Sequence, residues 1–396
     1  MNRRTITALL LVTASCGDPQ PGAPSVAVTE LLGAGDSRGF ERADGPREFV
    51  FPDDHGAHPT FQTEWWYVTG NVTSASGRPF GFHLTLFRRG LRQADGRSSD
   101  LAPNDLWMGH FAIADVEGGQ VHLHERTARG AGGLAGAELT GGDGADPRLR
   151  VWLEDWELLG VEGLGATDRP RLRLAAREGD DGLELELNAA RPPVLQGDAG
   201  YSRKGAGDGQ ASYYFAVTRS AASGTLRVDG QEYEVDGSAW LDREWSTSVL
   251  GQDQVGWDWF ALQLDDGTDL MLYQMRLANG AVDATSHGSV TLPSTDAAAP
   301  QHRKLEQGEY TIHADDRWTS PRTGGVYPSG WSVTVPSDDL QLVVTPLLRD
   351  QELPLTVVYW EGAVRVTGTR AGQTVSGVGF VELTGYADGA AAPPVR

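Results

Sequence analysis

From Phe49 onward the chain is a series of short runs in which apolar and polar residues alternate, separated by turns that contain glycine and aspartate. Such runs are GFHLTLFRR (81–89), GHFAIADV (109–116), GLELELN (182–188), ALQLDDGTDLMLYQMR (261–276) and GWSVTVPS (330–337). Alternation with a period of two places successive side chains on opposite faces, which is typical of β-strands. No long segment has the apolar period of an amphipathic helix. The sequence therefore predicts an all-β protein built from barrels or sandwiches.

Two parts of the chain resemble each other about half a chain apart. WYVTGNVTSASGRPFGFHLTLFRR starts at Trp66 and WFALQLDDGTDLMLYQMR starts at Trp259, an offset of 193 residues in a chain of 396. Each part has two aromatic residues, an apolar strand, a turn with glycine, and a second apolar strand that ends at arginine. A chain of this length is natural for two domains. We therefore expect a duplicated β domain, with an N-terminal unit at 46–248 and a C-terminal unit at 249–390.

The N-terminus has the pattern of an export signal. Arg3 and Arg4 precede an apolar run that is too short to span a bilayer, and small residues then lead to Cys16 in VTASC. We predict a lipoprotein-like signal peptide at 1–16 with lipidation of Cys16, followed by a flexible tether at 17–45. The protein would be exported, and either periplasmic or a lipoprotein that meets the membrane through its lipid anchor only. The alternative is an ordinary secretory peptide with an incidental cysteine.

Charge and missing motifs disfavour several functions. The net charge of −21 disfavours nucleic acid as a partner, because phosphate backbones are themselves anionic. The sequence has no P-loop, no Gly-x-Gly-x-x-Gly fingerprint and no HExxH motif. Its Gly-x-Ser-x-Gly match, GDSRG at 35–39, lies in the segment predicted as a tether and not on a strand-to-helix turn, so a typical α/β-hydrolase is disfavoured. His122 and His124 would point to one face of a strand and could ligate a metal, but a surface strand is the favoured interpretation. Neither a metal nor a cofactor is expected.

Carboxylates stand beside several of the twelve tryptophans, as in EWW and WDW. On a strand, Glu64 shares a face with Trp66, and Asp258 shares a face with Phe260. If these faces line the barrels, each carboxylate lies at the mouth of an apolar cavity, where loss of water raises its pKa and leaves it able to donate a proton. Pairing with an arginine would lower the pKa instead. The arginines considered for such pairing are Arg88, Arg243 and Arg276. These arguments favour a structural role for Glu64 and leave the role of Asp258 open.

Several motifs together resemble the AttH/CrtC family. They are TEWWYVTGNVTSASGRPFGFHLTLFR, GHFAIAD, GYSRKG, ASYYF, AWLDREWSTS, GWDWFALQLDDGTDLMLYQMR, YWEGAVRVTG and GVGFVELTGY, and they follow in family order from about residue 49 to residue 386. The resemblance implies two lipocalin-like antiparallel β-barrels packed together. It also implies an apolar cavity of polyene or isoprenoid size. Members of the family include carotenoid 1,2-hydratases, AttH-type proteins associated with ABC-transporter operons, and fungal polyketide cyclases of the Diels–Alderase type.

The resemblance further implies which residues form the site. In the hydratases, an acid/base set that includes a histidine beside the EW segment is expected to hydrate a terminal double bond. The corresponding segment here is Asp242-Arg243-Glu244-Trp245, and the arginine at the histidine position cannot exchange protons at neutral pH. The catalytic candidates are Asp258, Glu244, Tyr273 and His110, although a buried structural role is favoured for His110. The ligand-binding candidates are Glu64, Trp65, Trp66, Tyr214, Arg243, Trp245, Trp257 and Trp259.

Three functions remain open from the sequence. The first is an exported AttH-like carrier that holds an apolar isoprenoid, polyene or lipid between the barrels, with an ABC transporter as a partner. The second is a cofactor-free hydratase, isomerase or cyclase, in which a carboxylic acid protonates an alkene and tryptophan faces stabilise the carbocation. The third is a secreted hydrolase, which ranks last because the sequence has no recognisable nucleophile triad.

Overall fold

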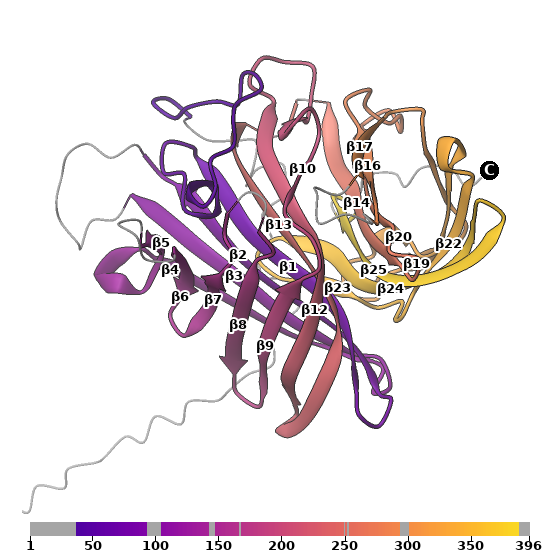
Figure 1. The fold of residues 1–396 in the computed structure, drawn as a ribbon, viewed down its shortest axis with the longest axis horizontal. Coiled ribbons are helices and arrows are strands. Elements are labelled where there is room, and N and C mark those ends of the chain that lie inside the picture. Colours follow the sequence, from indigo (N-terminus) through magenta and orange to yellow (C-terminus); the bar gives the residue numbers. More distant parts are fainter. Residues whose placement is uncertain are drawn as a thin grey trace, which may run out of the picture.

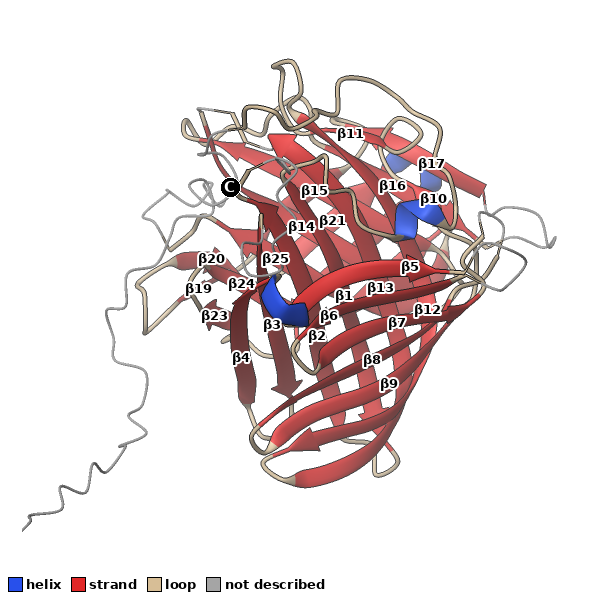
Figure 2. Cartoon of the chain, turned by 90° about the vertical axis from the view of Figure 1, so that its left-hand side faces the viewer, coloured by secondary structure: helices blue, strands red, loops and turns tan. Residues whose placement is uncertain are grey.

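The computed structural model describes residues 37–92, 104–141, 147–165, 168–248, 250–251, 253–293 and 301–387. These residues form antiparallel β-strands and three short 3-10 helices, η1 (Asp53–His55), η2 (Ala131–Gly133) and η3 (Pro336–Asp338) (Figures 1 and 2). The all-β prediction is confirmed. None of the helices in this part of the chain is long and apolar enough to cross a membrane. The predicted signal peptide, Cys16 and most of the predicted tether lie outside the described residues, so lipidation and export stay predictions.

The first sheet curls into a barrel and, within the described residues, contains thirteen strands. Its strand order is β4-β3-β2-β1-β13-β12-β9-β8-β7-β6-β5, and β10 and β11 both pair with β12. The strands are β1 (Thr63–Ser74), β2 (Pro79–Gly90), β3 (Asp105–Asp115), β4 (Gln120–Arg129), β5 (Ala135–Thr140), β6 (Arg148–Leu153), β7 (Trp156–Glu162), β8 (Arg171–Glu178), β9 (Asp181–Ala189), β10 (Val194–Leu195), β11 (Tyr201–Arg203), β12 (Ala211–Val228) and β13 (Gln231–Ser248).

The second sheet forms the other barrel, drawn from salmon through orange to yellow in Figure 1. Its order is β17-β16-β15-β14-β25-β24-β22-β21-β18, with β23 paired to β24, and β19 and β20 form a separate small sheet. The strands are β14 (Gln254–Leu264), β15 (Asp269–Leu277), β16 (His287–Leu292), β17 (Gln301–Glu306), β18 (Thr311–Ala314), β19 (Arg317–Thr319), β20 (Val326–Pro328), β21 (Trp331–Val335), β22 (Leu340–Pro346), β23 (Glu352–Pro354), β24 (Val358–Arg370) and β25 (Gln373–Thr384).

The two barrels repeat one strand order around their central strands. In the first barrel β1 lies between β2 and β13, and β12 follows β13. In the second barrel β14 lies between β15 and β25, and β24 follows β25. The turn predicted at DDG (265–267) joins β14 to β15 as a hairpin. The resemblance between the two halves of the sequence therefore corresponds to a repeated arrangement of strands.

The offset of 193 residues between the halves is wrong by one residue. Trp66 packs inside the first barrel, whereas Trp259 packs in the cluster between the barrels. Phe260 on β14 packs inside the second barrel as Trp66 packs inside the first. It follows Trp66 by 194 residues. Because side chains alternate along a strand, a shift of one residue exchanges the two faces.

Each barrel is filled by its own apolar core. On β9, Leu183, Leu185 and Leu187 point inward and are buried, while Glu184 and Glu186 between them are exposed. This is the alternation from which the strand was predicted. Burying a leucine side chain stabilises the fold by about 1.5–3 kcal/mol, so the inward faces supply most of the driving force for closing the sheets.

Strand β1 is buried on both of its faces. Trp66 and Val68 belong to the core of the first barrel. Tyr67 faces the second barrel, where its ring meets the ring of Trp259 edge-on, with the centroids 5.4 Å apart. A strand covered on both faces has no reason to alternate with polar residues. This double burial explains why Trp65, Trp66 and Tyr67 follow one another in TEWWYVTGN.

The two barrels approach each other closely along β1 and β2. Asn71 Nδ2 donates a hydrogen bond to the backbone oxygen of Gly379 over 2.9 Å. A Cβ atom at Gly81 would lie only 2.6 Å from the Cβ of Ala363, so any larger residue at this position would push the barrels apart. The barrels are therefore packed together, as the resemblance implied.

Candidate functional site

A pocket lies between the two barrels. Its walls come from β1, β2, β3, β12 and β13 on one side and from β14, β15, β24 and β25 on the other. More than half of the lining residues are aromatic or aliphatic, and the others carry charged or polar groups. They are Thr63, Trp65, Tyr67, Phe87, Arg88, Arg89, Leu106, Met108, His110, Lys204, Tyr214, Asp242, Glu244, Trp257, Trp259, Tyr273, Val357, Tyr359, Glu382 and Thr384. A largely apolar wall with a few converging polar groups is the usual composition of a small-molecule site.

The pocket brings together seven of the twelve site residues that the sequence predicted. These are Trp65, Tyr214, Trp257, Trp259, Glu244, Tyr273 and His110. The other five, which do not line the pocket, are Glu64, Trp66, Arg243, Trp245 and Asp258. The cavity was expected on the faces of Glu64 and Asp258, but the pocket lies on the opposite faces of β1 and β14. The faces of these two carboxylates turn into the barrels.

Glu382 on β25 places a carboxyl group in the pocket wall. Trp257 Nε1 donates a hydrogen bond to Glu382 Oε2 over 3.0 Å. Protein surrounds the carboxyl group, and the side chain keeps part of its surface open to the pocket. Burial raises the pKa of Glu382 to about 7, and the neighbouring charge of Glu244 acts in the same direction. A carboxyl group with a pKa near neutrality can both donate and accept a proton at physiological pH.

Two more buried carboxyl groups belong to this region, Asp242 in the pocket wall and Glu361 beside Glu382. Asp242 on β13 accepts a hydrogen bond from Trp240 Nε1 over 2.6 Å and lines the pocket. Glu361 on β24 pairs with Glu382 across the sheet and accepts a hydrogen bond from the hydroxyl group of Tyr67. Burial raises the pKa of both Asp242 and Glu361, and the proximity of Glu382 raises that of Glu361 further. Crowded carboxyl groups resist ionising together, which favours the protonated form of each.

Lys204 contributes a positive charge to the same wall. Its Nζ atom lies 2.9 Å from Glu244 Oε1 and 4.5 Å from the centre of the Tyr273 ring. Glu244 also accepts a hydrogen bond from the Ser212 hydroxyl group. Trp259 Nε1 completes this side by donating to the Tyr214 hydroxyl oxygen over 3.3 Å. Lys204, Tyr214 and Tyr273 could hold an oxygen atom of a bound molecule.

His110 connects the two barrels at the pocket wall. Its Nδ1 atom lies 2.6 Å from the hydroxyl oxygen of Tyr359 on β24, and its Nε2 atom lies 3.2 Å from Glu125 Oε1. The Thr356 hydroxyl group donates to Glu125 Oε2 over 2.8 Å. The ring of His110 is therefore held on both sides and lines the pocket at the same time, which fits the structural role favoured from the sequence.

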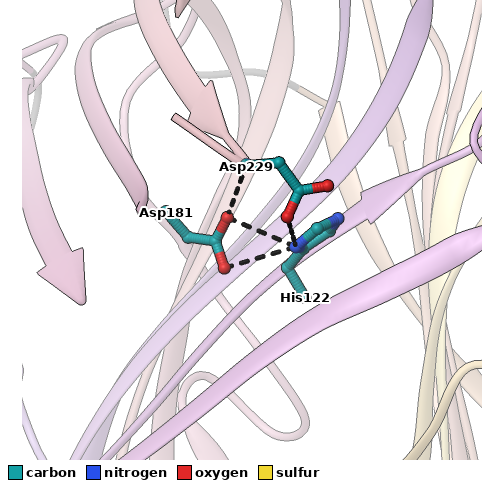
Figure 3. A group of neighbouring side chains, drawn as sticks. All are labelled: His122, Asp181 and Asp229. Atoms are coloured by element: carbon teal, nitrogen blue, oxygen red, sulfur yellow. Dashed lines mark hydrogen bonds and ion pairs between the residues drawn. The ribbon is translucent and has the colours of Figure 1, made fainter. Parts of the chain in front are cut away.

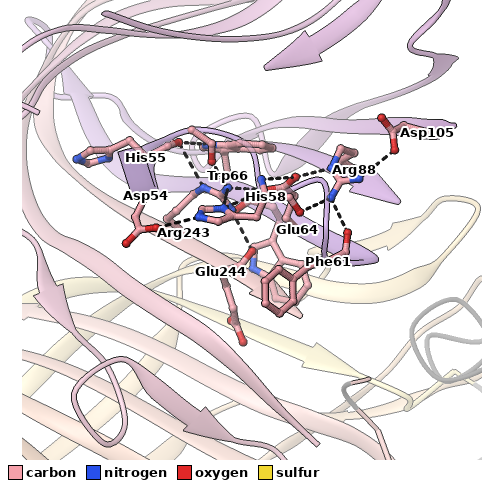
Figure 4. A network of polar contacts seen from close by, with 12 residues as sticks. Asp54, His55, His58, Phe61, Glu64, Trp66, Arg88, Asp105, Arg243 and Glu244 are labelled. Carbon is pink, nitrogen blue, oxygen red and sulfur yellow. Dashed lines mark hydrogen bonds and ion pairs between the residues drawn. The ribbon is translucent and has the colours of Figure 1, made fainter. Parts of the chain in front are cut away.

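Glu64 lies at the centre of a buried ionic network (Figure 4). Its carboxylate accepts hydrogen bonds from Arg88 and Arg243, and from the backbone nitrogen of His58 over 2.9 Å. The guanidinium group of Arg243 lies 3.9 Å from the centre of the Trp66 ring. Burial by itself would raise the pKa of Glu64, but the two arginines hold it well below its ordinary value. These contacts support the structural role for Glu64 and make Arg243 its structural partner.

Trp245 and Asp258 also have structural contacts. The ring of Trp245 stacks on the ring of His58, with the centroids 3.7 Å apart. Asp258 Oδ1 accepts hydrogen bonds from Arg276 Nε over 3.1 Å and from the Tyr386 hydroxyl group over 2.9 Å. Burial raises the pKa of Asp258, although Arg276 opposes this shift. A catalytic role for Asp258 stays a prediction, but its partners are in the second barrel and it does not line the pocket.

Glu382, Asp242 and Lys204 were missed as candidates by the sequence reasoning. Glu382 stands in GVGFVELTGY, where it shares a strand face with Phe380 while Val381 faces the other way. A carboxylate flanked by apolar residues within a strand is a signal that could have been used, because burying a charge is costly. Its partner Trp257 could not be read from the sequence, since the two are 125 residues apart.

The fold and the site define a lipocalin-like two-barrel β protein with a largely apolar pocket between the barrels. The sequence profile of the family described as AttH-like matches residues 42–386. The chain belongs to the AttH-like family, and the resemblance noted from its motifs is confirmed.

Solved structures with this fold support the assignment. A protein from Nitrosomonas europaea assigned as AttH is 34% identical, covers 88% of this chain and 100% of its own, and superposes with a TM-score of 0.73. Kievitone hydratase from Nectria haematococca is 14% identical, covers 88% of this chain and 99% of its own, and has a TM-score of 0.61. At that identity the similarity shows the fold alone.

A dehydratase is also similar to this chain in sequence. Dehydratase asqC from Emericella nidulans is 23% identical over 239 residues, which are 57% of this chain. The match spans 64% of that dehydratase, less than two thirds of its length.

Proposed function

We propose that the protein binds an apolar isoprenoid, polyene or lipid-like molecule between the barrels and adds water to it, or removes water from it, without a cofactor. The observation that carries the proposal is Glu382, a carboxyl group with a pKa of about 7 in a pocket walled by aromatic rings. Such a group is partly protonated at neutral pH, so it can give a proton to a double bond or to a leaving hydroxyl group.

The proposed chemistry needs only Glu382, water and the aromatic wall. In hydration, Glu382 gives its proton to one alkene carbon, and the π electron pair forms the new C–H bond. The cation on the other carbon would lie beside Trp257 and Trp259, whose ring faces attract positive charge. A water oxygen then forms the C–O bond, and the proton released from that water returns to the Glu382 carboxylate. Dehydration follows the same steps in reverse.

The names of two relatives favour this class of reaction. Dehydratase asqC and kievitone hydratase are named for removing and adding water, respectively. Their identities to this chain are 23% and 14%, so they support the reaction class as a proposal and say nothing of the substrate. Isomerase or cyclase chemistry would begin with the same protonation, but it would take up no oxygen from water.

Turnover in water labelled with oxygen-18 distinguishes hydration from isomerisation or cyclisation. The purified protein is incubated with a panel of isoprenoid alkenes and the matching tertiary alcohols, and the products are analysed by mass spectrometry. Hydration incorporates one heavy oxygen atom per product, while isomerisation or cyclisation changes retention time at constant mass. Binding of panel members without conversion of any of them would count against catalysis and favour a carrier.

The pH dependence of turnover should show the ionisation of the Glu382 carboxyl group. Because burial raises the pKa of this carboxyl group to about 7, it is protonated below that pH and charged above it. If Glu382 is the proton donor, kcat/KM falls as the pH rises through about 7. The measurement is a pH–rate profile of the wild-type protein. A profile without any decline across that range would contradict the role of Glu382 as an acid.

A carrier without catalytic activity is the second candidate. The observation in its favour is Arg243, which occupies the position expected for a catalytic histidine and is bound to Glu64 instead. Mass spectrometry of organic extracts of the purified protein tests this candidate, since a carrier should release a bound lipid or polyene. Export and an ABC-transporter partner belong to this hypothesis and stay proposals.

Ligand binding should depend on the tryptophans of the pocket. We expect Trp65→Ala to weaken the binding of the neutral probe N-phenyl-1-naphthylamine by about tenfold or more, because a large apolar contact is lost. Trp152→Ala is the matched control, because Trp152 on β6 is half-buried and does not line the pocket. Fluorescence titration measures both affinities. Equal losses in the two variants would show that the probe binds elsewhere.

The hydrolase alternative gains no support from the pocket. Ser202 Oγ lies 3.1 Å from His287 Nε2, which resembles part of a nucleophile pair. Both residues are buried, and neither lines the pocket. Burial lowers the pKa of His287 to about 3, so this ring is a poor base.

A further inference from the structure

We propose that the first barrel carries a site for a divalent cation of the Zn²⁺ type, formed by His122, Asp181 and Asp229. The three residues come from separate parts of the barrel (Figure 3). His122 lies on β4, Asp181 begins β9, and Asp229 lies in the turn between β12 and β13. None of them lines the pocket between the barrels, so this inference does not depend on the proposed function.

The ligand atoms of the three residues lie within 4.8 Å of one another. His122 Nδ1 lies 3.2 Å from Asp181 Oδ1, 3.3 Å from Asp181 Oδ2 and 3.8 Å from Asp229 Oδ1. Ligands bound tetrahedrally to zinc at about 2.0–2.1 Å are separated from one another by about 3.3 Å. A direct N–H···O hydrogen bond is usually about 2.9–3.0 Å long. The two distances from His122 Nδ1 to the Asp181 oxygens are somewhat longer than this and match the spacing expected of two zinc ligands.

Neighbouring groups hold the proposed ligands in place. The backbone nitrogen of Asp229 donates to Asp181 Oδ1 over 3.0 Å, and His124 Nε2 lies 2.9 Å from Asp181 Oδ2. His124 is thus a positioning residue that orients the Asp181 carboxylate. His122 Nε2 is buried and has no partner among the described residues. The orientation of the His122 ring is therefore set by the two carboxylates on its other side.

The donor set and its exposure indicate the type of ion. Zinc accepts imidazole nitrogen together with carboxylate oxygen and often keeps water in a remaining position. Mg²⁺ and Ca²⁺ prefer oxygen ligands alone, which disfavours them beside His122. The side chain of Asp229 is 73% exposed and that of His122 is 9% exposed, so an ion can enter from the Asp229 side and keep a water there.

A cation at this position would join an edge strand to two hairpins. β4 is one end of the strand order in the first sheet. Asp181 begins β9 in the β8–β9 hairpin, and Asp229 lies in the turn of the β12–β13 hairpin. Binding should therefore stabilise the folded protein, because the unfolded chain does not hold these three residues together.

Titration with Zn²⁺ and Co²⁺ tests the proposal on full-length protein that carries no affinity tag and has been treated with a chelator. We expect one equivalent of Zn²⁺ per chain by calorimetry, visible absorption bands on addition of Co²⁺, and a higher Tm with Zn²⁺ than without it. Absence of saturable binding at one equivalent, or no change in Tm, would overturn the proposal.

Conservative variants locate the binding. Asp181→Asn and Asp229→Asn keep the size of each side chain, and asparagine also tolerates the positive φ of 49° at position 229. We expect each to weaken Zn²⁺ binding by about ten- to a hundredfold. His313→Gln is the control, because His313 and Asp315 form an exposed pair 2.9 Å apart outside the site. Unchanged affinity in both Asp variants, with loss in the control, would place the ion elsewhere.

Discussion

Glu382→Gln should lower turnover by about a hundredfold or more while leaving ligand binding nearly unchanged. Glutamine is close to glutamate in size, and its oxygen can still accept the hydrogen bond from Trp257 Nε1, which is 3.0 Å long in the wild type. The amide cannot release or take up a proton near neutral pH, so the proposed protonation step is lost. The measurement is kcat on any substrate found in the isoprenoid panel, together with the affinity for N-phenyl-1-naphthylamine.

A matched variant separates this effect from a general loss of charge. Glu184→Gln changes an exposed carboxylate on β9, which pairs with Arg173 over 3.7 Å and lies outside the pocket. It should retain wild-type turnover. If Glu382→Gln also retains turnover, Glu382 is not the acid, and Asp242 becomes the next candidate because burial raises its pKa as well.

Glu64→Ala should lower the free energy of unfolding by about 3–5 kcal/mol, because it removes the carboxylate that two buried guanidinium groups share. Arg88 and Arg243 are 2% and 1% exposed, and only Arg88 keeps a second carboxylate, Asp105, at 2.9 Å among the described contacts. The measurement is urea denaturation followed by tryptophan fluorescence. Glu162→Ala is the control, since Glu162 pairs with Arg171 at an exposed position over 3.2 Å. That pair should contribute about 1 kcal/mol or less.

Acid should have the same effect as the Glu64 substitution. The pKa of Glu64 is lower in the folded state than its ordinary value of 4.5. The carboxylate therefore stabilises the fold at pH values above 4.5, and this contribution is lost as the pH falls below it. The wild type should lose more stability than Glu64→Ala over this acidic range. Parallel pH curves for the two proteins would show that Glu64 is not the titrating group.

The strands could be predicted from the sequence because their cause is local. Alternation in GLELELN follows from one buried and one exposed face of β9, and the DDG turn needs only its own residues. The pairing of Arg88 with Glu64 and of Arg276 with Asp258 was also within reach, since these are natural partners for buried carboxylates. Arg88 and Arg276 are two of the three arginines that the sequence suggested as partners.

The position of the pocket could not be predicted in the same way. The sequence shows which residues of β1 share a face, but both faces carry tryptophan, so it does not show which one opens on a cavity. Packing of the second barrel decides this, and it places Trp65 and Tyr67 toward the pocket and Trp66 toward the core. The pKa of Glu382 depends on the same long-range packing, because Trp257 and Glu244 approach its carboxyl group from other strands.

Because β1 is buried on both faces, the residues that shape the ligand pocket alternate along this strand with the residues that stabilise the first barrel. Substitutions at Trp65 or Tyr67 alter the shape of the pocket, whereas substitutions at Trp66 or Val68 alter the core of the first barrel. Alternate positions can therefore change independently in evolution or in the laboratory. A designer could adapt such a protein to new ligands by varying every second residue of β1 and β14 while the remaining residues keep both barrels closed.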